Sequence, residues 1–194
     1  MRDAWLRSSP LGLGLAGAAA LWLAFPNGWI SLPPLALLLP LCLALLGSSA
    51  PSAGAALRRG WLSSIVGMAA VLYWLTIPMA TVGNLPMALA AVCAVLVATC
   101  LASAGGLFSL LAHALRGRGP LAQAWVLGLA WYFLEYVYAL VAGFPWLPLG
   151  GALAAWPLWI QAADVTGAYL LAGLWVTVIL SLRHWRRPAC VCTG

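Results

Sequence analysis

The chain of 194 residues is too apolar and too poor in charge for a soluble domain, because 65% of its residues are hydrophobic and 6% are charged. Soluble domains contain roughly 45–50% apolar and 25% charged residues. Composition therefore excludes a soluble globular enzyme, and it excludes a disordered chain, which would be polar. Twelve Trp and 20 Gly are typical of helical membrane proteins. The sequence predicts an all-α fold, a polytopic helical membrane bundle.

The net charge of +6 comes from nine Arg and no Lys, against three acids. The Arg residues stand in short groups at the ends of apolar runs, and no basic stripe with interleaved aromatic residues exists. This distribution argues against nucleic acid as a partner. It is typical of the charges that set the orientation of membrane helices.

Six apolar runs approach or reach the roughly 20 residues that cross a hydrocarbon core about 30 Å thick. In chain order they cover residues 9–25, 29–46, 61–77, 86–115, 121–142 and 165–182. The second run contains Pro33, Pro34 and Pro40, so we expect it to be kinked or to begin late. The predicted connections are a polar loop over 47–60, a turn over 78–85, a break at 116–120 and a long apolar loop over 143–164.

The arginines predict the orientation of these spans. If the N-terminus is cytoplasmic and six spans alternate, all nine Arg lie on the cytoplasmic side and none in the outer loops. We therefore expect both termini inside, with one transmembrane domain over 1–187 and a short cytoplasmic tail over 188–194. The alternative is that Arg2, Arg7 and the first run form a cleaved signal peptide, which would leave five spans.

Cysteine and histidine do not form a metal-binding pattern. Three of the five Cys lie inside apolar runs, Cys190 and Cys192 form a C-x-C pair in the tail, and His113 and His184 stand alone. No Ser-His-Asp set, no activated Cys and no glycine-rich phosphate loop can be assembled. We therefore expect no metal, no cofactor and no catalytic residue within these residues.

Glu135 is the only acid inside an apolar run, and it lies toward the predicted outer face. Acids within the membrane are costly and mark functional sites by default. Trp131 and Tyr132 lie four and three residues before it and share its helical face. Two interpretations remain open: Glu135 faces a cavity or substrate path, or it is bonded to a neighbouring helix or wetted at the outer headgroups.

The segment after this run carries Phe144, Pro145 and Trp146 between two glycines. Proline stops a helix here, and an apolar loop beside Glu135 suits contact with a lipid. The alternative is an ordinary turn in the interfacial aromatic belt. Tyr73 and Trp74, near the outer end of the third run, either line the same cavity or belong to that belt. Asp164 precedes the sixth run, so we expect it to cap that helix.

Several short motifs occur in order from about residue 11 to 182. They are Leu-Ala-Phe-Pro at 23–26, Arg-Gly-Trp at 59–61, Tyr-Trp-Leu at 73–75, Trp131 to Glu135, Gly-Phe-Pro-Trp at 143–146, Leu-Gly at 149–150, and Gln161, Asp164, Gly167 and Tyr169. With these motifs the chain resembles the N-terminal membrane part of apolipoprotein N-acyltransferase.

The resemblance implies transfer of an acyl chain from a membrane phospholipid to the N-terminal diacylglyceryl-cysteine of a lipoprotein, at the outer face of the bacterial inner membrane. It also implies that the catalytic Cys, Glu and Lys belong to a nitrilase-like domain further along. On the resemblance, Glu135, Trp131, Phe144, Pro145, Trp146, Tyr73 and Trp74 are the candidate substrate-binding residues.

The sequence departs from this family in that no nitrilase-like segment and no Lys are present. Tyr136 to Tyr138 also stand where the family has an Arg shortly after the Glu, and Gly151 stands where it has a Tyr. We expect a truncated or split form that is inactive alone and that partners a lipoprotein substrate or a separate nitrilase-like chain. The alternatives are a small transporter or lipid-binding membrane scaffold, or a purely structural membrane partner.

Overall fold

The computed structural model describes residues 9–185 except 26, 28, 29, 144, 146 and 155, and every regular element in these residues is helical. The all-α prediction is confirmed. The elements are α1 (Pro10–Ala24), η1 (Pro33–Leu37), α2 (Leu38–Ser48), α3 (Ala53–Val71), η2 (Leu72–Leu75), α4 (Thr76–Thr81), α5 (Met87–Ala114), α6 (Pro120–Ala142), α7 (Leu149–Leu153), α8 (Pro157–Ile160), α9 (Ala163–Thr166) and α10 (Ala168–Trp185).

Three helical stretches are long and apolar enough to cross a membrane. They are the continuous stretch from α3 to α4 with 29 residues, α5 with 28 and α6 with 23. Three shorter apolar helices, namely α1, η1 with α2, and α10, correspond to the other predicted runs. The helices fit a membrane bundle, and the count of six spans stays a prediction.

The start of α3 corrects the predicted loop over 47–60. Ser52 caps this helix by accepting a bond from the backbone N of Ala55 at 3.2 Å, so the connection shrinks to four residues, 49–52. Arg58 and Arg59 consequently lie within the helix. The small and polar residues of this stretch suggested a loop, but Ala, Leu and Arg are strong helix formers.

The prolines shape the second and third runs in different ways. Pro33 and Pro34 stand at the first positions of η1, where a missing N–H costs nothing, so the helix begins late as expected. Pro78, in contrast, lies inside α4. Its backbone nitrogen has no hydrogen to donate to the carbonyl oxygen of Trp74, and its ring lies close to that oxygen. The 3-10 turn η2 directly precedes α4, and its tighter winding accommodates the missing hydrogen bond and the proline ring.

Small residues allow the helices to approach closely at two crossings. Between α3 and α5, Gly60 faces Ser109, so that a side chain at Gly60 would collide with the Ser109 hydroxyl and with the backbone of Gly105. Between α6 and α10, a Cβ at Gly173 would lie 2.6 Å from the carbonyl oxygen of Gly128. Such contacts are the usual means of helix association in membranes, where apolar burial gives no net drive.

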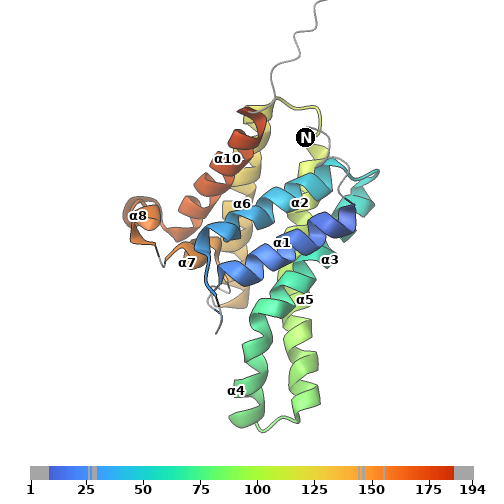
Figure 1. Ribbon diagram of the computed structural model, residues 1–194, viewed down its shortest axis with the longest axis vertical. Helices are drawn as coiled ribbons and strands as arrows, with labels where there is room; N and C mark the ends of the chain where they lie inside the picture. The colour runs from blue at the N-terminus through green and yellow to red at the C-terminus, as the bar shows by residue number, and fades with distance from the viewer. Residues whose placement is uncertain are drawn as a thin grey trace, which may run out of the picture.

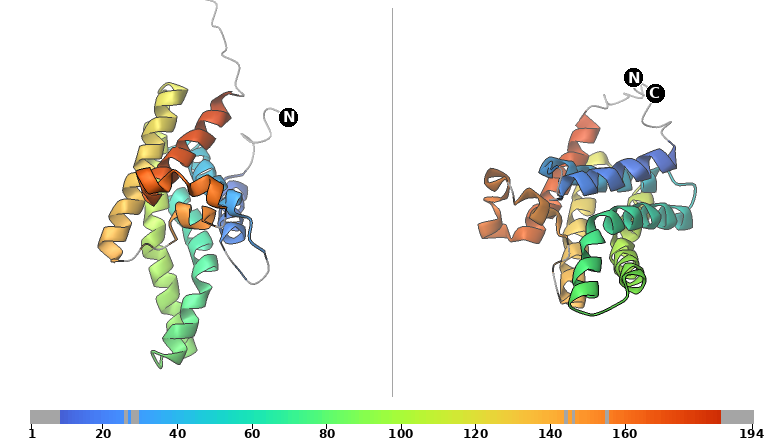
Figure 2. Two further views of the ribbon diagram at one scale, coloured as in Figure 1. Left: turned by 90° about the vertical axis from the view of Figure 1, so that its left-hand side faces the viewer. Right: turned by 60° about the horizontal axis from the view of Figure 1, so that its bottom comes forward.

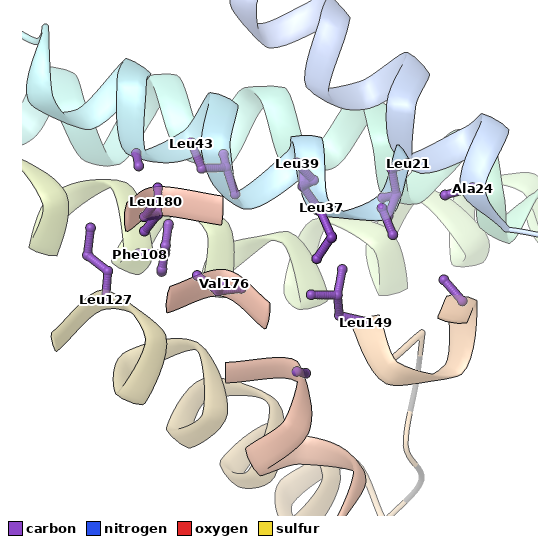
Figure 3. Packing of buried hydrophobic residues seen from close by; sticks show 14 of the residues in the cluster. Leu21, Ala24, Leu37, Leu39, Leu43, Phe108, Leu127, Leu149, Val176 and Leu180 are labelled. Atoms are coloured by element: carbon purple, nitrogen blue, oxygen red, sulfur yellow. The ribbon is translucent and has the colours of Figure 1, made fainter. Parts of the chain in front are cut away.

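The helices form two groups that meet at a shared core. α1, α2, α3 and α5 contact one another, and α6 packs mainly on α10 (Figures 1 and 2). Leu43, Phe108, Leu127, Leu149 and Val176, from five different helices, point toward one another between these groups (Figure 3). Figure 1 also shows α4 and the first part of α5 extending beyond the rest of the molecule.

Candidate functional site

The carboxyl group of Glu135 joins α6 to the segment that follows it. Its Oε1 accepts a hydrogen bond from Trp131 Nε1 at 2.9 Å and another from the backbone N of Leu149 at 2.7 Å. Trp131 lies one helical turn before Glu135, as predicted from the spacing. Leu149 is the first residue of α7, so Oε1 of Glu135 connects this short helix to the membrane-length helix α6 through a hydrogen bond.

The second carboxyl oxygen of Glu135 is exceptional. Oε2 is buried and has no hydrogen-bond partner among the described residues, and the same holds for the hydroxyl of Ser64 on α3. Buried polar atoms are nearly always bonded, so an unpartnered one calls for an explanation. Both residues line one cavity, and each unpartnered atom is available to a polar group that enters it.

This cavity has a volume of about 70 Å³, which is several times the roughly 10–15 Å³ that one water needs. Its wall comes from both helix groups and from the segment before α7, and most of it is apolar. Besides Ser64 and Glu135, the side chains in the wall that carry a polar group are Trp131, Tyr138 and Tyr169. The site can hold a short part of an apolar chain and donate or accept a few hydrogen bonds.

The structure brings together only some of the predicted site residues. Trp131, Glu135 and Pro145 line the cavity. Tyr73 and Trp74 lie on η2 with 54% and 44% of their surface exposed, and they are not part of its wall. Phe144 and Trp146 lie outside the described residues.

The sequence did not point to Ser64 or Leu147. Ser64 is one of the small residues with which α3 packs on α5, and its place in a row of Gly and Ser was the available signal. Leu147 has φ of 47°, an uncommon backbone conformation for a residue other than Gly. It contacts the apolar clusters on both sides of the cavity, so tertiary packing accounts for a conformation that local sequence would not favour.

Asp164 does not cap the sixth apolar helix as expected. It lies in the first turn of the four-residue helix α9, and α10 begins only at Ala168. Gly167 separates the two helices with φ of 77°, a conformation that ends a helix and that Gly adopts without strain. In the described part of the chain, no group of three or more His, Cys, Asp or Glu is placed to hold a metal ion.

These features define a class: an all-helical domain with membrane-length helices and a buried carboxyl group at an apolar cavity. The family described as Apolipoprotein N-acyltransferase N-terminal domain matches residues 17–181. The chain belongs to this family.

Two relatives illustrate the similarity. The apolipoprotein N-acyltransferase of Bordetella bronchiseptica is 33% identical over 190 residues, which cover 89% of this chain and 35% of that protein. The apolipoprotein N-acyltransferase of Geobacter metallireducens is 34% identical over 153 residues, which cover 77% of this chain and 27% of that protein. The chain thus spans about a third of the length of the curated relatives it matches.

Proposed function

We propose that this chain is the membrane module of a phospholipid-dependent N-acyltransferase that acts on the N-terminal diacylglyceryl-cysteine of lipoproteins. The observation that carries the proposal is the family match over residues 17–181. The cavity at Glu135 supports it, because an apolar wall with few hydrogen-bonding groups suits the acyl chain and the glycerol linkage of a lipid. Glu135, Trp131 and Pro145 are the described residues that would contact it, and a membrane phospholipid is its partner.

We further propose that residues 1–194 have no acyltransferase activity by themselves. The family's reaction uses a Cys, a Glu and a Lys in a nitrilase-like domain, and these residues contain no Lys. The segment before α7 would instead contact the lipid next to that domain. A separate nitrilase-like chain, or the remainder of a longer chain, would supply the chemistry.

An acyl-transfer assay tests this proposal. Purified residues 1–194, reconstituted in phospholipid, should convert no diacylated lipopeptide into its triacylated form, as followed by mass spectrometry. Co-expression with the nitrilase-like part of a relative should give product. Product from residues 1–194 alone would contradict inactivity, and failure of every complementing partner would favour a lipid-binding scaffold or a transporter.

We also propose a multi-pass location in the bacterial inner membrane, with six spans and both termini in the cytoplasm. The support is that all nine Arg lie outside the six apolar runs, at the ends that alternating spans would place inside. Arg58 and Arg59 keep this place although they belong to the second turn of α3. Reporter fusions test it. A cytoplasm-active reporter fused after Ala50 or Gly119 should be active, and one fused after Asn84 or Gly151 should be inactive. The reverse result at any one position would contradict the six-span arrangement.

A further inference from the structure

Arg116, in the turn that follows α5, has a guanidinium group that the protein itself holds in place. Its Nε donates to the backbone oxygen of His113 at 3.1 Å, and its Nη1 donates to the backbone oxygen of Ala50 at 2.9 Å. Its Nη2 lies 2.8 Å from Nε2 of His113. Since arginine has no acceptor, the imidazole nitrogen accepts this bond. These three hydrogen bonds hold the guanidinium group in one orientation.

His113 is the positioning residue of this arrangement. With its Nε2 accepting from Arg116, its Nδ1 carries the ring proton and faces the backbone oxygen of Gly47 at 3.3 Å. The same imidazole therefore contacts the end of α2 and the side chain of Arg116. The turn from α2 to α3 and the end of α5 are joined through these two side chains.

The fixed guanidinium group nevertheless keeps donors for a ligand. Arginine carries five N–H groups, so the three bonds leave one N–H on each of Nη1 and Nη2. Arg116 is exposed. An exposed arginine usually loses side-chain entropy when it binds, but here the protein has already restricted the side chain. Both remaining N–H groups lie in the guanidinium plane and can donate to the oxygens of a phosphate group.

The charge around Arg116 is positive. Arg118 follows two residues later, is exposed, and makes no ion pair or side-chain hydrogen bond with the described residues. The acids among those residues are Glu135, on the cavity in the second half of α6, and Asp164, in α9. Figure 1 shows the turn between α5 and α6 at the end of the molecule opposite α4. No described acid in this turn neutralises the two arginines.

We propose that Arg116 and Arg118 bind the phosphodiester headgroup of an anionic phospholipid of the phosphatidylglycerol type. The turn joins two membrane-length helices, so it lies at the level of the headgroups. Leu121 and Trp125, on the first two turns of α6, are 65% and 52% exposed. They form an apolar surface next to the arginines that suits the acyl chains of the same lipid. In this arrangement the headgroup contacts the guanidinium groups and the acyl chain lies along α6. A free phosphate ion would contact only the guanidinium groups.

The test compares two substitutions that both keep the positive charge. Arg116→Lys removes the planar donors of the guanidinium group. Arg58→Lys changes an exposed arginine whose side chain has no hydrogen bond or ion pair with the described residues. The full chain is reconstituted in phosphatidylcholine nanodiscs with a small fraction of phosphatidylglycerol, and bound lipid is counted by native mass spectrometry. We expect Arg116→Lys to weaken phosphatidylglycerol binding about tenfold and Arg58→Lys less than twofold.

Arg118→Gln provides a second variant, because the exposed Arg118 side chain has no hydrogen bond or ion pair with the described residues, and it should weaken binding about threefold. Thermal unfolding of every variant, compared with the unaltered chain, checks that the fold is retained. Equal binding by Arg116→Lys and the unaltered chain would overturn the proposal, as would equal losses in Arg116→Lys and Arg58→Lys. Inorganic phosphate that binds the detergent-solubilised protein as tightly as phosphatidylglycerol would identify a free-anion site and would overturn the assignment to lipid.

Discussion

Gly128→Val should lower the free energy of unfolding by about 3 kcal/mol, since overpacking of a tight contact typically costs 1–3 kcal/mol. A Cβ at position 128 would lie 2.6 Å from the backbone oxygen of Gly173 and would collide with the hydroxyl of Thr177. That hydroxyl donates to the Gly173 oxygen at 3.0 Å, so the neighbour cannot rotate away without losing its own bond. The two helices would have to separate at this crossing.

Gly54→Val is the matched control for this substitution. Gly54 also belongs to a helix, as the second residue of α3, but a Cβ there meets nothing within 4 Å. Helix propensity alone predicts that valine at this position changes the free energy of unfolding by less than about 1 kcal/mol. Thermal unfolding of both variants in one detergent separates close packing from propensity. A Gly128→Val protein as stable as the unaltered chain would contradict the described crossing of α6 and α10.

The apolar runs of the sequence predicted most of the helices because hydrophobic length is a strong local signal. α1, α5 and α6 each begin and end within a residue or two of the predicted runs. The contact between Trp131 and Glu135 was also predictable, because residues four apart in a helix are neighbours. The bounds of a helix and the contact between Trp131 and Glu135 both depend on residues of one helix, so the local sequence is enough to predict them.

The remainder of the site depends on contacts between helices, which a single sequence does not rank. Ser64 reaches the cavity because Gly105 lets α3 approach α5 closely, and 20 glycines in the chain offer many equivalent crossings. Leu149 reaches Glu135 through a segment with two prolines and a positive φ at Leu147. The predicted loop over 47–60 failed for the opposite reason, because local helix propensity outweighed its polar composition.

Glu135→Ala should release α7 from α6 and lower the free energy of unfolding by about 1–3 kcal/mol. The substitution leaves two donors, the Leu149 N–H and Trp131 Nε1, without their acceptor. Each such loss costs about 1–3 kcal/mol in a soluble protein and about 0.6 kcal/mol on average between membrane helices. Hydrogen–deuterium exchange should show that the Leu149 amide has lost its protection.

Glu135→Gln and Trp131→Phe dissect this effect. Glutamine keeps an oxygen for both donors and turns its amide toward the cavity, so the Leu149 amide should stay protected. Trp131→Phe removes one donor, yet it keeps a ring against Phe108, whose centroid lies 5.0 Å from that of Trp131. The Leu149 amide should therefore stay protected in Trp131→Phe as well. If the Leu149 amide stays protected in Glu135→Ala, packing alone holds α7 in place. The Glu135 carboxyl group would then have no structural role here, and its role would be contact with a ligand in the cavity.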